Sequence, residues 1–388
     1  MSLDRRIFWV WLQHALGAGS SKQNRIFENY PSLADFYSAG MQGWLLQGCF
    51  TPKELDKLSS FSPTDAAALI DYSEKIGQRV ITPECEDYPE TLRQIHNPPC
   101  ALYVKGTLPD FSSALGISIV GTRKATATGA AAARSFAFEL AKQGVVIVSG
   151  GALGIDTAAH KGALQAGGKT VCVLGCGIDF NYLMGNALLR AAIANSGAVI
   201  SEYAPGTQAV NSNFPIRNRI ISGLTLGTLV VEAAGKSGSL ITADYALEQG
   251  RDVFAIPAGI YSPVSQGVNN LIKSGAKPVS NAGEILEEYL ARFPDKISLD
   301  DVTTNVLVQD ESLPEIPERG FAPEPLNLDA FSADAAALYA ELTVLPRHIS
   351  ELASQTGISV PRLLTAVTEL ELAEKISSHS GRRYSLPR

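Results

Sequence analysis

The sequence predicts an α/β protein built on an extended Rossmann-like, doubly wound, mostly parallel sheet. Short runs rich in β-branched residues alternate with Ala-rich segments of helical length, and each run is bounded by Gly or polar residues. The runs span residues 117–120, 145–148, 170–174, 198–200, 228–231 and 253–256. Strands this apolar are typical of a parallel sheet covered on both faces. Ligands bind such sheets beyond the carboxyl ends of the strands, so we expect the functional site there.

Composition limits the class of protein. A chain of 388 residues that is 45% hydrophobic and 18% charged is typical of a soluble protein with two or three domains. The apolar stretch at residues 7–12 is short and lacks a cleavage site, which favours an amphipathic helix over a signal peptide. We therefore expect a cytoplasmic protein without membrane contact. Five cysteines without a Cys-x-x-Cys pair predict reduced thiols and no metal site.

The distribution of charge keeps a nucleic-acid partner open despite the net charge of −7. Residues 294–330 carry nine acidic and two basic side chains, so this segment alone accounts for the net charge. The rest of the chain is neutral overall and can hold a local basic groove.

Four segments follow one another along the chain. They are a helical module resembling a sterile-alpha-motif or helix-hairpin-helix domain (1–75), the extended Rossmann domain (76–293), an acidic flexible linker (294–330) and a winged-helix domain (331–388). A simple helical cap is the alternative for the first segment. Strands at 80–81 and 101–104 extend the sheet, and Pro278-Val279 forms its last strand. In the final segment, three helical patterns precede a Ser-Gly turn flanked by alternating residues, which predicts a winged helix.

The first strand of the sheet ends in a turn suited to an anion. Gly121 permits close approach of the backbone, the Thr122 hydroxyl can bind a phosphate oxygen, and Arg123 can donate two hydrogen bonds to it. The spacing is not Gly-x-Gly-x-x-Gly, and no acidic residue ends the second strand to hold a ribose. A dinucleotide dehydrogenase is therefore disfavoured, and we expect no cofactor.

The second strand ends in three glycines before a helix, at Gly150, Gly151 and Gly154. Such a turn can expose backbone amides that bind an anion. Asp156 is read as an N-cap, and His160 as a hydrogen-bonded helix histidine rather than a catalytic residue.

A third cluster, residues 211–223, brings cations and an aromatic ring to the start of a helix. Phe214 is expected to be exposed as a platform for a base, with Arg217 and Arg219 as phosphate clamps. The two arginines cannot share a helix face unless one of them lies in the first turn. A solvated surface helix is the alternative.

Residues 235–239 form a Gly/Ser-rich turn that resembles the end of a Walker A motif. The Gly-x-x-x-x-Gly-Lys spacing is absent, because residue 230 is Val. ATP hydrolysis is therefore not supported.

Taken together, these motifs resemble those of the DNA processing protein A (DprA/Smf) family. The resemblance runs over residues 78–290 through Gly121-Thr122-Arg123, Ser149 to His160, Phe214 to Gly223, Gly238 to Ala243 and Val253 to Gly259. Ala258 departs from the Gly that is usual in the family.

The resemblance implies a homodimeric, non-enzymatic protein that binds single-stranded DNA in natural transformation, protects it, and loads RecA recombinase onto it. The positions that it assigns to DNA binding are Arg123, Lys124, Phe214, Arg217, Asn218, Arg219, Gly121, Thr122, Gly150, Gly151, Gly154, Ser239 and Thr242.

The winged helix is expected to contact either duplex DNA or a protein. Its recognition helix carries Arg362 with Glu369 and Glu371, which is a poor match to major-groove reading. The hairpin is basic, with Arg382 and Arg383, and suits phosphate contacts.

Two other functions remain as alternatives. A nucleotide-processing enzyme resembling nucleoside-monophosphate phosphoribohydrolases would need a Gly-Gly-x-Gly-Thr loop with a catalytic Arg and Glu, whereas here only Glu232 lies near the Gly/Ser-rich turn. A winged-helix DNA-binding regulator would instead read duplex sequence and use the Rossmann domain as a sensor.

Overall fold

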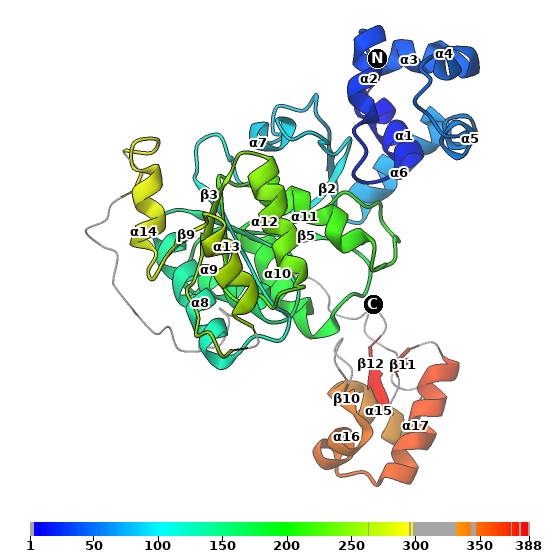
Figure 1. The fold of residues 1–388 in the computed structure, drawn as a ribbon. Coiled ribbons are helices and arrows are strands. Elements are labelled where there is room, and N and C mark those ends of the chain that lie inside the picture. Colours follow the sequence, from blue (N-terminus) through cyan, green and yellow to red (C-terminus); the bar gives the residue numbers. More distant parts are fainter. Residues whose placement is uncertain are drawn as a thin grey trace. The chain divides into compact units, whose positions relative to one another are not determined.

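The computed structural model describes residues 4–262, 264–294, 296–297, 331–342, 347–373, 375–379 and 382–386. The chain forms two compact units, residues 1–316 and 317–388, which are described one at a time. The larger unit joins a group of N-terminal helices to a sheet covered by helices (Figure 1). Most of the expected linker lies outside the described residues.

The described residues form a nine-stranded sheet in the order β1-β2-β6-β5-β4-β3-β7-β8-β9. The strands are β1 (Arg79–Ile81), β2 (Leu102–Gly106), β3 (Gly116–Val120), β4 (Val146–Ser149), β5 (Thr170–Leu174), β6 (Ala198–Ser201), β7 (Gly227–Val230), β8 (Asp252–Ala255) and β9 (Lys277–Pro278). Pairing is parallel from β6 to β9, whereas β2 pairs antiparallel with both β1 and β6. The mostly parallel Rossmann-like sheet predicted from the sequence is confirmed.

Helices cover both faces of this sheet (Figure 1). They are α7 (Glu90–Arg93), α8 (Ala127–Lys142), α9 (Ile155–Gln165), α10 (Ala187–Ser196), α11 (Asn213–Gly223), α12 (Gly238–Glu248), α13 (Gln266–Lys273) and α14 (Gly283–Leu286), with 3-10 turns at Met184–Asn186 and Glu287–Tyr289. Side chains of α8 and α9 pack with Ile117 and Ile119 in one core cluster. Those of α11 and α12 pack with Val146 and Val148 in another. Successive strand residues point to opposite faces, so each strand contributes to both cores.

The order of the strands reverses beside β3. From β3 the chain moves outward through β4, β5 and β6, and then returns to place β7 on the other side of β3. Loops leave the carboxyl ends of β3 and β7 in opposite directions, and this divergence opens a crevice in doubly wound sheets. The fold therefore places a binding crevice at the ends of β3 and β7.

The N-terminal module is a bundle of short helices: α1 (Arg6–Leu16), α2 (Lys22–Asn29), α3 (Leu33–Ser38), α4 (Gly40–Leu46), α5 (Pro52–Ser60) and α6 (Pro63–Lys75). Local signals fix their starts, since Thr51 and Ser62 form capping boxes before a Pro at the first helical position of α5 and α6. Trp11 is fully buried at the centre, and its indole N–H donates to the Leu58 carbonyl at 3.1 Å.

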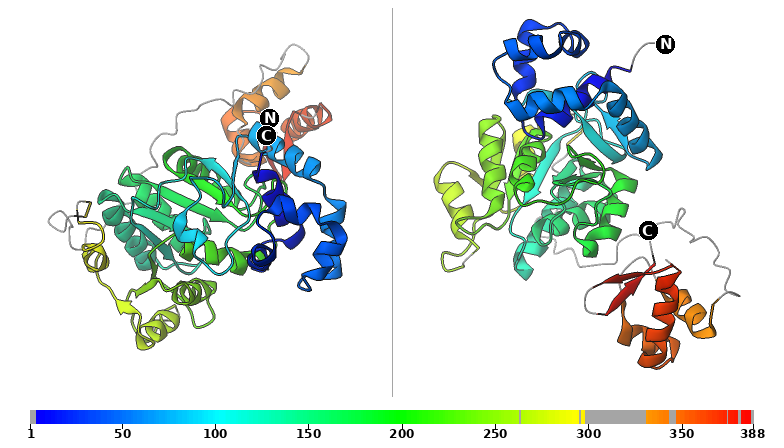
Figure 2. Two further views of the ribbon diagram at one scale, coloured as in Figure 1. Left: turned by 90° about the horizontal axis from the view of Figure 1, so that it is seen from above. Right: turned by 90° about the vertical axis from the view of Figure 1, so that its right-hand side faces the viewer.

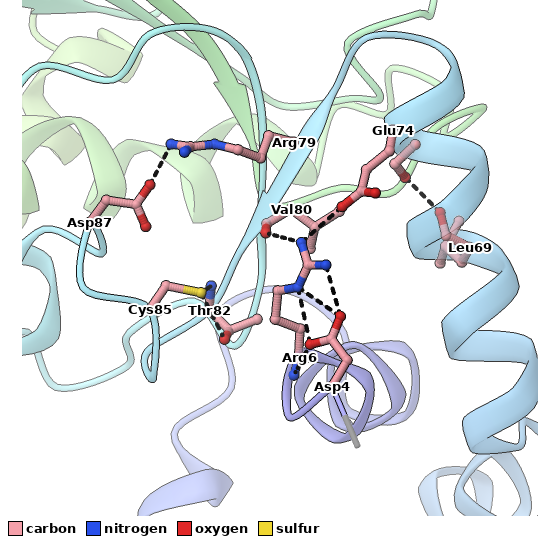
Figure 3. A network of polar contacts seen from close by, with 10 residues as sticks. Asp4, Arg6, Leu69, Glu74, Arg79, Val80, Thr82, Cys85 and Asp87 are labelled. Carbon is pink, nitrogen blue, oxygen red and sulfur yellow. Dashed lines mark hydrogen bonds and ion pairs between the residues drawn. The ribbon is translucent and has the colours of Figure 1, made fainter. Parts of the chain in front are cut away.

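The module is packed onto the sheet through its first strands, β1 and β2 (Figure 2). Tyr103 of β2 is buried within the same apolar cluster as Trp11. At the edge of this contact the Arg6 guanidinium donates to Asp4, to Glu74 at 2.9 Å and to the Val80 carbonyl at 3.2 Å (Figure 3). Helices α1 and α6 are thus fixed to each other and to β1.

The smaller unit contains helices α15 (Ala333–Glu341), α16 (Ile349–Thr356) and α17 (Val360–Leu372). Its sheet has the order β10-β12-β11, with β10 (Arg347–His348), β11 (Ser377–His379) and β12 (Arg383–Ser385). Three helices with a short antiparallel sheet form a winged helix, as the sequence predicts (Figures 1 and 2). Throughout the described part of the chain, every helix is too short or too polar to span a membrane.

Candidate functional site

A pocket of about 420 Å³ opens at the carboxyl edge of the sheet, where β3, β4 and β7 end. Of the residues expected at the site, those that line it are Gly121, Arg123, Phe214, Arg217, Asn218, Ser239 and Thr242. Those outside its lining are Thr122, Lys124, Gly150, Gly151, Gly154 and Arg219. The pocket therefore lies at the crevice that the strand order predicts, and residues of the sequence motifs line it.

The exposed cations of the site follow β3. Arg123 and Lys124 are both exposed, and the Arg123 guanidinium lies 5.2 Å from the centre of the Phe214 ring. The turn that carries them is fixed from within, because the Thr122 amide donates to the Glu232 carbonyl at 2.9 Å and the Lys124 amide to the Thr122 hydroxyl at 3.2 Å. Two exposed positive charges on a hydrogen-bonded turn are suited to phosphate oxygens.

Phe214 is buried rather than exposed, with 9% of its surface accessible. Arg217 lies 5.9 Å from its ring centre, on the same helix, and the Tyr182 ring lies 5.2 Å away. The expectation of an exposed Phe214 is therefore wrong. The ring supports Arg123 by a cation–π contact, and Phe214 lines the pocket although little of its surface is accessible.

Arg217 is also buried, at 4% exposure, and is fixed against the ends of two strands. Its Nη1 donates to the Gly150 carbonyl at 2.7 Å and to the Val173 carbonyl. Burial lowers the pKa of the guanidinium, and the nearby Asp156 partly offsets this effect. Arg217 thus brings a fixed positive charge to the pocket wall and does not reach out as a flexible clamp.

The glycine turn after β4 already holds an anion of its own. The Asp156 carboxylate accepts from the Ala152 amide at 3.2 Å and also bonds to Ser149 and Gly150. Burial raises the pKa of Asp156, and these bonds together with Arg217 counteract the rise. The anion cradle expected at Gly150 and Gly151 is therefore filled by the chain itself, because Asp156 folds back from the first turn of α9.

Gly154 has a packing role in the same region. It precedes α9 with φ +82°, and a Cβ there would collide with the Thr122 carbonyl. Its conformation brings the turns after β3 and β4 together, and the Ile155 amide donates to the Thr122 carbonyl at 3.2 Å.

Arg219 points away from the pocket and is fully buried. Its Nη2 lies 2.7 Å from Glu202 Oε1, and the two side chains are 1% and 2% exposed. The phosphate contact expected for Arg219 does not fit these surroundings, because both groups are enclosed and paired. The helical twist that separates residues 217 and 219 sends one arginine to the pocket and the other to β6.

The turn into α12 closes the other side of the pocket with neutral donors. Asn218 donates to the Gly238 carbonyl at 3.2 Å, and the hydroxyls of Ser237 and Ser239 lie 2.8 Å apart. Thr242 is buried one turn further along. The start of a helix together with hydroxyl groups is a suitable partner for a phosphate or a base edge.

The carboxylate required by the phosphoribohydrolase alternative is engaged elsewhere. Glu232 is 7% exposed and accepts from the Thr126 amide at 3.0 Å and from the Thr126 hydroxyl, at the start of α8. It thereby stabilises the N-terminal end of that helix. His160 is likewise buried, with its Nδ1 2.7 Å from the Thr170 hydroxyl, and burial lowers its pKa to about 3.

Several residues of the pocket wall escaped the sequence analysis. They include Asn211, Ser237, Gly238 and Ile241, besides Asp156, which was read only as a cap. All of them lie inside or beside the sequence motifs. Their position in a motif was therefore the sequence feature that could have identified them as pocket residues. Which side chains of a motif face the crevice depends on how its helix is packed.

Comparison with known proteins identifies the family of the chain. The family model for DNA recombination-mediator protein A matches residues 79–290, more than half of the chain, and a DprA winged helix domain model matches residues 322–382. The chain belongs to this family. DNA processing protein DprA of Streptococcus pneumoniae is 41% identical over 244 residues, which cover 63% of this chain and 84% of that one. Protein Smf of Escherichia coli is 36% identical over 345 residues, covering 87% and 85% of the two chains.

Solved structures of family members agree. The crystal structure of DprA from Streptococcus pneumoniae aligns with a TM-score of 0.63 and 34% identity, covering 74% of this chain and 99% of that one. DNA processing protein A from Helicobacter pylori, whose structure was described for its single-stranded DNA binding mode, aligns with a TM-score of 0.50 and 31% identity, covering 55% and 96%. The resemblance to the DprA/Smf family seen in the sequence is confirmed.

The recognition helix of the winged unit offers few charges to DNA. Arg362 is paired with Asp334 at 2.6 Å, and Glu369 accepts from the Ser332 amide at 2.7 Å. Arg383 of β12 is exposed. If this unit binds duplex DNA, the exposed hairpin is therefore better suited to contact phosphates than the recognition helix.

Proposed function

We propose that the chain is a recombination mediator that binds single-stranded DNA at the pocket beyond β3 and β7. The observation that carries the proposal is that the exposed cations Arg123 and Lys124 follow β3 at a pocket of about 420 Å³. The wall of this pocket includes further hydrogen-bond donors, among them Arg217 and Ser239. Phosphates would meet the two cations, and a base would enter beside Phe214 and the Ser239 hydroxyl, which both line the pocket.

The structure described for Helicobacter pylori DNA processing protein A supports the choice of single-stranded DNA. Protection of incoming DNA in natural transformation, loading of RecA and homodimer formation are proposed on family membership. So is a role in binding rather than catalysis, which the engagement of Glu232 and the burial of His160 support.

The test is fluorescence anisotropy with a labelled oligothymidine strand and with a duplex, each over a series of salt concentrations. Arg123→Ala and Lys124→Ala should each reduce the slope of log K against log salt by about 0.7, the value for one phosphate contact with a single strand. Lys142→Ala is the matched control, because Lys142 is an exposed lysine at the far end of α8 and thus at the opposite edge of the sheet.

Equal slopes for Lys124→Ala and Lys142→Ala, with Arg123→Ala also unchanged, would refute the proposed site. No binding of the single strand at low salt would refute the function, and nucleoside monophosphates would then be the next ligands to assay. Loading of RecA is tested by its rate of filament formation on single-stranded DNA with and without this protein.

A further inference from the structure

One buried carboxylate joins the N-terminal module to the helix that builds the pocket. Glu202 follows β6, and its Oε1 accepts two hydrogen bonds from different parts of the chain. One comes from Arg219 of α11 at 2.7 Å, and the other from the backbone amide of Gly19 at 3.3 Å. Gly19 lies in the turn between α1 and α2, far from α11 in sequence.

The same turn is packed closely against α11. Gly19 has φ +79°, and a Cβ at this position would lie 2.7 Å from Ile216 Cγ2. The turn is held in place from its other side, because Asn97 donates to the Gly19 carbonyl at 3.1 Å. Ile216 is β-branched and therefore stiff in a helix, so pressure on its Cγ2 is passed to the helix backbone rather than absorbed by a rotamer change.

Helix α11 carries five residues of the pocket wall, which are Phe214, Pro215, Arg217, Asn218 and Ile221. The rotation of this helix is set by the contacts around it, which include the packing of Ile220 and Ile221 against the sheet. Two further contacts involve the N-terminal turn. Ile216 lies against Gly19, and Arg219 is paired with Glu202, which also accepts from the Gly19 amide. The orientation of the pocket wall is therefore coupled to the N-terminal module.

The polar link has little redundancy. Among the described residues, Glu202 Oε2 and the Nε and Nη1 atoms of Arg219 are buried without a hydrogen-bond partner. Within the part of the chain that the structure describes, the Gly19 amide is thus one of two hydrogen-bond donors to the Glu202 carboxylate. A buried carboxylate that loses one of two donors relaxes toward the remaining one, which here means a shift of Arg219 and α11.

We propose that the turn at residues 17–19 is a positioning element for the nucleic-acid pocket: through Glu202, Arg219 and Ile216 it sets the orientation of α11 and thereby the affinity for single-stranded DNA. The proposal rests on the function proposed above. It gives the N-terminal module a role in binding without contact with DNA, so a protein or ligand that displaces the module would weaken the pocket.

The decisive comparison is Gly19→Ala against Gly17→Ala in the full-length chain. Both glycines have a positive φ, +79° and +73°, so both substitutions strain the backbone, and Gly17, with ψ −177°, lies in a region that essentially only glycine adopts. Gly19 faces Ile216 of α11, whereas among the described residues no atom lies within 4 Å of a Cβ built at Gly17. We expect Gly19→Ala to weaken oligothymidine binding by about tenfold, as for loss of one charge-assisted hydrogen bond, and Gly17→Ala to leave it within about twofold.

Two readouts separate positioning from general destabilisation. In the absence of DNA, amide hydrogen exchange in α11 should be faster in Gly19→Ala than in Gly17→Ala. Adding Ile216→Ala removes the methyl group that the new Cβ meets, so Gly19→Ala/Ile216→Ala should bind DNA as tightly as Ile216→Ala alone. If Gly19→Ala does not fold, Asn97→Ala loosens the same turn without a clash and should weaken binding by about threefold.

Equal affinities and equal exchange in α11 for the Gly19 and Gly17 variants would overturn the proposal, as would failure of Ile216→Ala to rescue. A variant such as Asn97→Ala that matches the unmodified protein in both measurements would overturn it too. Failure of the function itself is recognised separately, because the unmodified protein would then not bind oligothymidine or would not respond to Arg123→Ala.

Discussion

Replacing Arg219 with methionine should destabilise the protein strongly. The contacts that the pocket makes with DNA phosphates should stay the same in number. The Arg219 and Glu202 side chains are 1% and 2% exposed and lie 2.7 Å apart, so the substitution leaves a buried carboxylate without its cation. Breaking such a pair costs about 3–5 kcal/mol. At roughly 2–3 °C for each kcal/mol in a unit of this size, the expected fall in Tm is about 6–15 °C.

Removing both charges should restore most of this loss. In Arg219→Met/Glu202→Met the buried site becomes apolar, which is often neutral for stability. The Gly19 amide then loses its acceptor, at a cost of about 1 kcal/mol. We therefore expect the double variant to melt within a few degrees of the unmodified protein and well above the single variant.

The assay is thermal unfolding followed by circular dichroism, together with anisotropy of oligothymidine over a salt series well below each Tm. Because Arg219 is enclosed, Arg219→Met should keep the salt slope of the unmodified protein even if its affinity falls through a shift of α11. An unchanged Tm combined with a slope reduced by about 0.7 would identify Arg219 as a phosphate contact and refute our reading of its role.

Two further substitutions test the core beneath the site. His160 has a pKa of about 3 in the folded state against a usual 6.5, so below pH 6.5 the unfolded chain binds a proton that the folded chain does not. Its contribution to stability should fall by about 2 kcal/mol between pH 7.5 and 5 in urea titrations, and His160→Gln should remove this part of the pH dependence, whereas an unchanged dependence would contradict the assignment. Gly151→Ala places a Cβ 2.5 Å from Cys172 Sγ at φ +69° and should cost about 2–4 kcal/mol. Gly167→Ala should cost about 1 kcal/mol, because Gly167 has the same φ and its Cβ would meet no atom of the described residues within 4 Å. If the two glycine variants lost similar amounts of stability, backbone strain alone would account for the loss and the contact with Cys172 would contribute nothing.

The sequence was sufficient for the order and type of the main elements. Each apolar run from residue 117 to residue 256 became a strand, because six unbroken β-branched runs between glycines have few other stable arrangements. The extension of the sheet by strands near residues 80 and 102 and the winged helix were likewise predicted. The expected last strand at 278–279 was found one residue earlier, at Lys277–Pro278.

The edge of the sheet that holds the pocket was also determined by the sequence. Parallel strands bring all their carboxyl ends to one side, so the motifs that follow them had to converge there. Family membership was readable for the same reason, since the long motifs at these strand ends occur in a fixed order. Nothing beyond chain order and strand direction was needed for these conclusions.

Tertiary packing alone decided what each side chain of a motif does. The helical period separates Arg217 from Arg219, but it does not say that α11 lies against both β5 and Glu202, so that both arginines are buried. It does not say either that Phe214 is covered by Tyr182, or that Asp156 fills the glycine turn. Exposure and pairing depend on neighbours far away in sequence, and a local pattern carries no information about them.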